Sequence, residues 1–166
     1  MSEGRLFGFP PVFREDARVL ILGSMPSVQS LKEQFYYAHP RNAFWNILAD
    51  CFEAPLPRTI GEKIQLLQNN RLALWDAAAS CERIGSLDSA IRAEIPNDFN
   101  ELLRSCPGLR HIFFNGATAE KLYRKYNAEN AVYGYRRLPS TSPAYTKPYA
   151  EKFEAWKQAF KEVNIL

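Results

Sequence analysis

Three short, continuous apolar runs recur along the chain, and each is followed at once by glycine, aspartate or asparagine. The strands that they predict cover residues 18–22, 72–75 and 111–114, and a fourth, more polar strand is expected at 133–138. Runs without alternation are typical of strands that are covered on both faces, as in parallel sheets. The pattern therefore predicts a buried, mainly parallel sheet.

Segments with apolar residues at positions i, i+3 and i+4 follow these runs, and this spacing is that of amphipathic helices. They cover residues 44–52, 60–68, 97–103, 118–126 and 153–163. Asn42 lies just before the first of these segments and Asn97 opens the third, and both suit helix N-caps. The alternation predicts an α/β fold, a three-layer α/β/α arrangement with a central, mainly parallel sheet of about four strands. Its 166 residues suit one domain, residues 1–166.

The carboxyl ends of parallel strands meet at one edge of the sheet, where α/β folds bind ligands. The segment after the first predicted strand, residues 23–45, is dense in aromatic and polar side chains. This density exceeds what a simple connection needs. The candidate site therefore starts in this segment, and its notable side chains are Phe35, Tyr36, Tyr37, His39, Arg41 and Asn42.

Composition and cysteine spacing exclude several classes of protein. No apolar run approaches the roughly 20 residues of a membrane helix, and no signal-peptide pattern opens the chain. We therefore expect a cytoplasmic protein. Cys51, Cys81 and Cys106 are too dispersed for a zinc site, a disulfide framework or a four-cysteine iron–sulfur cluster. The glycine fingerprint of a nucleotide cofactor is also missing, so we expect no metal and no cofactor.

The formal net charge of +3 and the pI near 8.8 permit nucleic-acid binding without requiring it. Whether the protein binds nucleic acid must therefore be judged from the positions of individual cationic residues. Basic residues near the predicted carboxyl edge are candidates for phosphate contacts. They are Arg41, Arg83, Arg136, Arg137 and Lys147.

Several ordered motifs resemble those of the uracil-DNA glycosylase superfamily. GSMP at 23–26, YAHPRNAFW at 37–45 and LPSTSP at 138–143 carry the resemblance. Together with WDAAASCERIGSLDSAI at 75–91, they look most like its hypoxanthine-DNA glycosylase (DNA-deoxyinosine glycosylase) branch. The resemblance covers nearly the whole chain. It implies a monomeric, monofunctional repair enzyme that flips a deaminated base, hypoxanthine above all, out of DNA and hydrolyses its N-glycosidic bond.

The resemblance also assigns roles in a base pocket. It implies base contacts by Gly23, Ser24 and Met25, with Tyr37 stacking on the base, although Tyr37 also suits simple packing. Many members of the uracil branch have an aspartate in place of Met25 to orient water. In the hypoxanthine branch the resemblance gives catalysis to Asn42, whose amide can hold a water but also suits the N-cap.

Asp76 takes approximately the position of the asparagine that reads uracil in the uracil branch. Its carboxylate can accept from the N1 proton of hypoxanthine, cap a neighbouring helix or pair with Arg83. Asn115 is a further base-binding candidate, although Asn-Gly after a strand is an ordinary turn signal.

The second motif of the family grips phosphates and supplies a bulky wedge to the base stack. Here the gripping residues are Ser140, Thr141 and Ser142. Ala144 is too small for the wedge, so either Tyr145 or another loop must supply it. Ser140 stands where many relatives have a catalytic histidine, and His39 is either structural or part of the site.

Two alternatives remain open from the sequence. Loop residues set base choice, so a uracil-DNA or mismatch-specific glycosylase is one of them. The other is a noncatalytic module that binds damaged DNA, because Met25 and Ser140 replace familiar catalytic residues.

Overall fold

The computed structural model describes residues 4–166, and residues 1–3 lie outside it. The strands are β1 (Arg5–Phe7), β2 (Val19–Gly23), β3 (Leu72–Asp76), β4 (Ala78–Glu82), β5 (Arg92–Pro96), β6 (His111–Asn115) and β7 (Gly134–Leu138). The helices are α1 (Val28–Glu33), α2 (Phe44–Cys51), α3 (Ile60–Asn69), α4 (Asn100–Ser105), α5 (Ala117–Tyr126) and α6 (Tyr149–Glu162), with a 3₁₀ turn, η1, at Asp88–Ala90.

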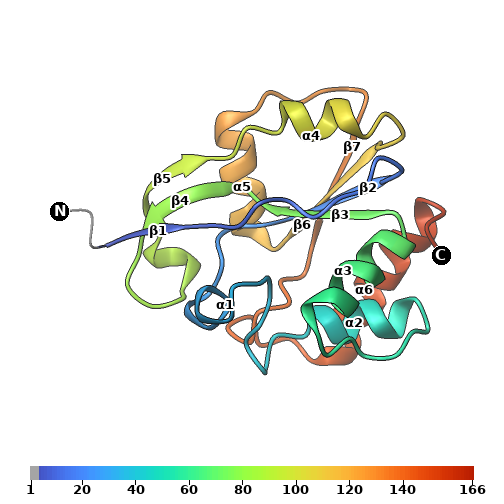
Figure 1. Ribbon diagram of the computed structural model, residues 1–166, viewed down its shortest axis with the longest axis horizontal. Coiled ribbons are helices and arrows are strands. Elements are labelled where there is room, and N and C mark those ends of the chain that lie inside the picture. The colour runs from blue at the N-terminus through green and yellow to red at the C-terminus, as the bar shows by residue number, and fades with distance from the viewer. Residues whose placement is uncertain (1–3) are drawn as a thin grey trace.

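The central sheet confirms the predicted fold class. Its strands lie in the order β3-β2-β6-β7, and every neighbouring pair is parallel. Each strand crosses to the next through helical segments on the faces of the sheet (Figure 1). The carboxyl ends consequently share one edge, where Gly23 lies beside Asp76 and Asn115 beside Leu138.

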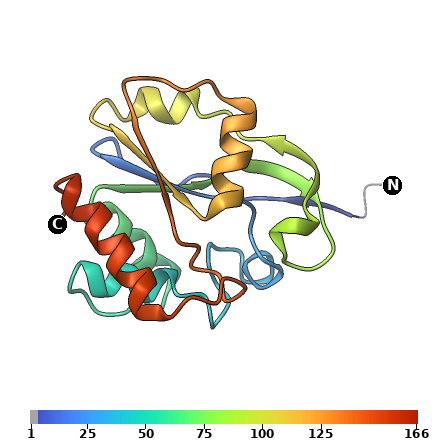
Figure 2. The same cartoon turned by 180° about the vertical axis from the view of Figure 1, so that it is seen from behind.

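Strand β2 shows why its apolar run does not alternate. Val19 and Ile21 join the core with α2, α3 and α6, whereas Leu20 and Leu22 join the core with α4 and α5. All four side chains are fully buried. The two views in Figures 1 and 2 place these helix groups on opposite sides of the sheet, which gives the expected three layers.

A second, antiparallel sheet of strands β1, β4 and β5 was not predicted. It flanks the central sheet on the side of the N-terminus (Figure 1). β4 begins two residues after β3 ends, so the chain passes from one sheet into the other across Ala77. This sheet positions the connection between β4 and β5, which reaches the site.

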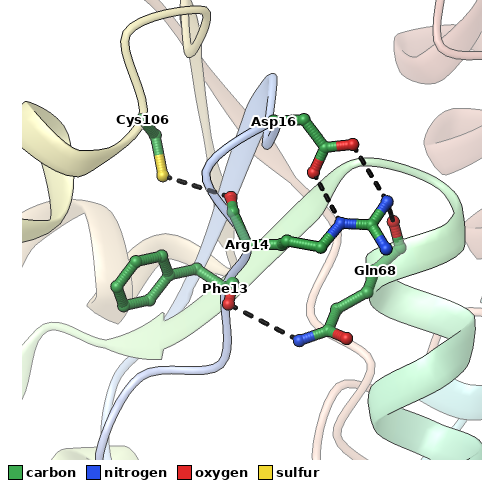
Figure 3. Close-up of polar contacts among 5 residues, drawn as sticks. All are labelled: Phe13, Arg14, Asp16, Gln68 and Cys106. Carbon is green, nitrogen blue, oxygen red and sulfur yellow. Dashed lines mark hydrogen bonds and ion pairs between the residues drawn. The ribbon is translucent and has the colours of Figure 1, made fainter.

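The segment between β1 and β2 contacts helices on both faces of the central sheet, at the end of the sheet opposite the carboxyl edge. Arg14 forms an ion pair with Asp16 and donates to the carbonyl oxygen of Gln68 at the end of α3. The Cys106 thiol, just beyond α4, donates to the Arg14 carbonyl oxygen (Figure 3). This segment therefore links the two helical layers far from the site.

The expected N-cap at Asn97 is corrected. Helix α4 begins at Asn100, with Phe99 as its N-cap, so Asn97 is not the cap. The Asn97 side chain instead donates to the main-chain oxygen of Asp76 at 2.8 Å. Within residues 4–166, no helix combines the length and apolar character needed to span a bilayer.

Candidate active site

A pocket of about 700 Å³ opens at the carboxyl edge of the central sheet. We call it the central pocket. It lies between segments that are distant in the sequence but follow β2, β3, β6 and β7. Its walls contain the predicted residues Gly23, Ser24, Met25, Tyr37, Asn42, Asp76, Asn115, Arg137, Ser140, Thr141, Ser142, Tyr145 and Lys147. The fold thus brings together most of the residues that the sequence singled out.

Gly23, the last residue of β2, makes room for two oxygens in the pocket wall. A Cβ atom on Gly23 would overlap the carboxylate of Asp76 and lie 2.6 Å from the Tyr37 hydroxyl. Real Cβ atoms do not approach a neighbour this closely. The glycine is therefore required for Asp76 and Tyr37 to converge on one point of the pocket.

Asp76 presents a buried carboxyl group to this point. Its side chain is 3% exposed, and no group in the described part of the chain hydrogen-bonds to its Oδ2 atom. Burial, aided by the charge of Asp88 and opposed by that of Arg83, raises the pKa of Asp76 to about 7. Pairing with Arg83, one of the alternatives for Asp76, is not seen among the described residues, and the Arg83 guanidinium donates to the Pro26 carbonyl oxygen. A ligand is the natural partner for such a carboxyl group.

Tyr37 is held in an unusual conformation beside it. Its φ of 53° lies in the left-handed region, which bulky residues rarely adopt and which is common at functional sites. Its ring stacks on Phe44, with ring centroids 4.1 Å apart and an interplanar angle of 25°. The hydroxyl is buried and has no partner among residues 4–166. Burial and the Asp76 charge raise the pKa of this hydroxyl, so it remains a proton donor.

Asn42 sits at the start of α2 and lines the central pocket. Its Oδ1 accepts from the main-chain N–H of Phe44 at 2.9 Å. The helix begins at Phe44 with Ala43 as N-cap residue, so the expected cap lies one residue later, although Asn42 supplies the capping atom. The Oδ1 atom keeps a second lone pair, and its amide N–H₂ can donate. The anchored amide can therefore hold a water in a fixed orientation.

Asn115 and Thr141 hold two walls of the pocket together. Asn115 Nδ2 donates to Thr141 Oγ1 at 3.0 Å, and the Thr141 main-chain N–H donates to Asn115 Oδ1 at 2.9 Å. The Ala43 main-chain N–H in turn donates to the Thr141 carbonyl oxygen. Gly116, with a φ of 94°, makes the turn that the Asn-Gly pair suggested. In this structure the Asn115 amide is engaged in positioning the loop.

The loop from Ser140 to Lys147 is also held by hydrogen bonds within the loop and from α6. The Ser140 and Ser142 hydroxyls accept from the main-chain N–H groups of Ser142 and Ala144, respectively. Lys152 donates to the Ser142 carbonyl oxygen at 3.1 Å, and burial lowers its pKa. Sequence reasoning missed Lys152, although its place four residues before Trp156 puts it on the apolar stripe of α6.

A smaller hollow of about 390 Å³ adjoins the central pocket, and we call it the side groove. It contains Arg41 and Lys152, and it shares Tyr145 and Lys147 with the central pocket. The cationic side chains of Arg41, Lys147 and Lys152 give the side groove a positive character that suits phosphates. His39 lines neither hollow, and its Nδ1 accepts from the Arg41 main-chain N–H, a local turn contact.

The predicted set of rim cations needs correction. Arg136 and Arg137 are neighbours on β7 and so point to opposite faces. Arg137 lines the central pocket and lies 3.5 Å from a carboxylate oxygen of Glu120. Arg136 forms an ion pair with Glu162 at the end of α6, away from the pocket. Arg83 is buried and likewise does not reach the rim.

One part of the site was not among the predicted residues. The connection between β4 and β5 contributes Ser86, Leu87 and Asp88 to the pocket wall. The Ser24 hydroxyl donates to Asp88 Oδ1 at 2.7 Å and so joins this connection to the first motif. The sequence GSLD at 85–88 is part of the motif at 75–91 that carries the family resemblance. The motif alone does not predict that this segment contacts Ser24.

In the part of the chain that the structure describes, no group of three or more His, Cys, Asp or Glu side chains is placed to hold a metal. The three cysteines are buried free thiols. The chemistry of the pocket therefore has to be read from its carboxyl, phenol and amide groups.

Comparison with known proteins gives one consistent result. Residues 10–164 match the family described as the uracil DNA glycosylase superfamily. Two curated relatives, from Methanosarcina acetivorans and Methanosarcina barkeri, are named hypoxanthine DNA glycosylase and are 38% and 32% identical over 158 residues. Each alignment covers 93% of this chain and 97% of the relative.

A solved structure has the same fold. It is the solution NMR structure of a candidate uracil DNA glycosylase from Methanosarcina acetivorans, with a TM-score of 0.81 and 35% sequence identity. The match covers 96% of this chain and 99% of that one.

Proposed function

Because the chain belongs to the uracil DNA glycosylase superfamily, we propose that it is a monofunctional DNA glycosylase that hydrolyses the N-glycosidic bond of hypoxanthine in DNA. The names of the two curated relatives support this substrate. The observation in this chain that carries the proposal is the buried Asp76 carboxyl, which lines the central pocket beside an equally buried Tyr37 hydroxyl.

These two groups complement one edge of hypoxanthine. The base offers an N1–H donor next to an O6 acceptor. Asp76 can accept from N1–H, and the Tyr37 hydroxyl is a donor with no other partner in the described residues. Gly23 leaves the space for both, and the main chain of Ser24 and Met25 completes the wall. The Tyr37 ring is stacked on Phe44. Stacking of this ring on the flipped base is the alternative to the hydroxyl contact, because one tyrosine cannot both cover the face of a base and donate to its edge.

The glycosidic bond breaks through a sugar cation, so catalysis requires a positioned water and donors for the departing base. We assign the water to the Asn42 amide, which the start of α2 holds rigidly. The positive end of α2 also favours negative charge developing nearby. Donors on the base side stabilise the leaving group as it gains electron density. No covalent intermediate is needed.

The DNA strand follows the rim between the two hollows. Ser140 and Ser142 bring hydroxyl groups to the phosphates on one side. Thr141 is buried and bonded to Asn115, so it holds this loop in place and does not contact the phosphates itself. Arg41, Tyr145 and Lys147 continue this surface along the side groove, and Arg137 joins it from β7. We expect residues 1–166 to act as one domain and one monomer, in the cytoplasm and at the nucleoid in a prokaryote, where the DNA is. No cofactor enters the mechanism.

Uracil is the second candidate base. It also offers an N–H donor beside a carbonyl acceptor, and the structural neighbour is described as a candidate uracil DNA glycosylase. A pocket of about 700 Å³ does not restrict entry to the smaller pyrimidine. Base choice must therefore be measured.

Single-turnover cleavage of labelled duplexes decides between these bases. Each duplex carries one deoxyinosine or one deoxyuridine, and alkali cuts the strand at every abasic site. We expect faster strand scission at deoxyinosine. Faster scission at deoxyuridine would reassign the substrate. Specific binding to either duplex without scission would instead indicate a noncatalytic damage-binding module.

A further inference from the structure

The connection between β4 and β5 is fastened across the mouth of the central pocket. Arg83 donates to the Pro26 carbonyl oxygen. Ser86 Oγ accepts from the Val28 main-chain N–H at 2.9 Å. In the third contact, the Ser24 hydroxyl donates to the Asp88 carboxylate. The three contacts reach residues 24–28, which run from the end of β2 to the first residue of α1, so the connection forms a strap on that wall.

Leu87 lies between two of these fastened residues and still exposes 59% of its surface. It also borders the central pocket. Its carbonyl oxygen accepts from the Ala90 main-chain N–H at 3.0 Å, which begins η1 and fixes its backbone. An exposed leucine is common on a protein surface. A leucine that stays exposed on a fixed backbone at the lip of the central pocket is a more specific arrangement.

The opposite lip offers a poorer wedge. Ala144 carries a single methyl group there. Tyr145 is 39% exposed, but the Lys152 ammonium lies 5.6 Å from the centre of its ring, and both side chains line the side groove. The usual position of the wedge is therefore filled by one side chain that is too short and another that already has a partner.

We propose that Leu87 is the wedge that enters the base stack when the target base turns into the central pocket. This inference rests on the proposed glycosylase function. Flipping leaves a gap between two base pairs, and an apolar side chain that fills it replaces the lost stacking. Because the strap already fixes the backbone of Leu87, insertion costs little additional conformational entropy.

Ile84 provides a matched control on the same strap. It is 95% exposed and apolar, but it does not border the central pocket. A general effect of removing an exposed apolar side chain from this connection would affect Leu87→Ala and Ile84→Ala alike. A wedge would affect Leu87→Ala alone.

The test compares these variants on duplex and single-stranded DNA carrying deoxyinosine. A single strand needs no wedge, because its base is already unpaired. We expect Leu87→Ala to excise from the duplex about ten-fold more slowly or worse, with less than about two-fold change on the single strand. Leu87→Met should recover most of the duplex rate, and Ile84→Ala should match the wild type.

A fluorescent 2-aminopurine beside the lesion reports flipping without chemistry, and its signal should fall in Leu87→Ala. Equal losses on both substrates would overturn the proposal, because they indicate a damaged pocket. A duplex-specific loss in Tyr145→Ala but not in Leu87→Ala would move the wedge to the other lip. If the wild type excised nothing, the proposed function would fail, and the fluorescence comparison would still decide the role of Leu87.

Discussion

The Asp76 carboxylate occupies the space that a Cβ atom on Gly23 would fill. Gly23→Ala should therefore displace Asp76 and close the base-recognition point, at a cost of about 1–3 kcal/mol. We expect excision of hypoxanthine to fall by about ten-fold or more, with little change in affinity for undamaged duplex. Single-turnover rates and fluorescence anisotropy measure the two quantities. Gly61→Ala in α3, where an added Cβ would make only an ordinary contact with the Thr59 side chain at 3.9 Å, is the control.

The protonation of Asp76 predicts a pH dependence. A neutral carboxyl can accept from N1–H and donate to O6 of hypoxanthine, whereas an ionised carboxylate can accept only. Because burial and the nearby Asp88 raise its pKa to about 7, with Arg83 opposing, excision should decline as the pH rises through 7. Asp76→Asn keeps both hydrogen-bonding functions at every pH, so its rate should be flat in this range. A decline that persists in Asp76→Asn would contradict this account.

The same carboxyl couples folding to pH. Its pKa is higher in the folded protein than the ordinary value of 3.8, so its contribution to stability is fully present below pH 3.8 and is lost as the pH rises to about 7. Asp76→Asn should therefore gain free energy of unfolding relative to the wild type, by a few kcal/mol at most, above neutral pH. Urea denaturation at pH 5 and pH 8 measures the difference.

Asn42 combines a helix-capping atom with the proposed water site. Asn42→Ala should lower the free energy of unfolding by about 1 kcal/mol and reduce excision by about 100-fold or more. Asn42→Asp keeps an acceptor for both the Phe44 N–H and the water, so it should keep the stability and part of the activity. Chemical denaturation and single-turnover rates separate the two effects. Full activity in a folded Asn42→Ala would remove Asn42 from catalysis.

The two arginines of β7 should behave differently toward DNA. Arg137→Ala removes a cation from the pocket wall and should reduce the slope of log affinity against log salt by about one. Arg136→Ala breaks the ion pair with Glu162 and should leave this slope unchanged, with a stability loss of about 1 kcal/mol or less. Anisotropy titrations at several salt concentrations measure both slopes. Equal changes in the two variants would mean that DNA also covers the α6 side of β7.

The parallel sheet could be predicted because its strands are buried on both faces and leave continuous apolar runs. The antiparallel sheet left no such pattern. β1 has three residues, and β5 is mostly exposed. β4 contains Ala, Ser and Cys, which give little strand signal. Pairing between residues 5–7 and 80–82 also spans some 75 positions, which no local pattern reports.

Most of the pocket could be predicted because every strand of a parallel sheet delivers its following loop to one edge. The position of a residue in the sequence does not show whether its side chain points into the pocket. Arg136 was grouped with Arg137, although neighbours on a strand point to opposite faces. Lys152 was overlooked because a lysine reads as solvated, yet it is only 5% exposed and braces the Ser142 loop.

The central claim is hydrolysis of the bond between hypoxanthine and its sugar in the central pocket. Its most direct test is mass-spectrometric detection of free hypoxanthine after single-turnover incubation of a deoxyinosine duplex with wild type and with folded Asn42→Ala. We predict one free base for each abasic site with the wild type, and almost none with Asn42→Ala. Intact deoxyinosine after incubation with a folded, DNA-bound wild type would contradict the account.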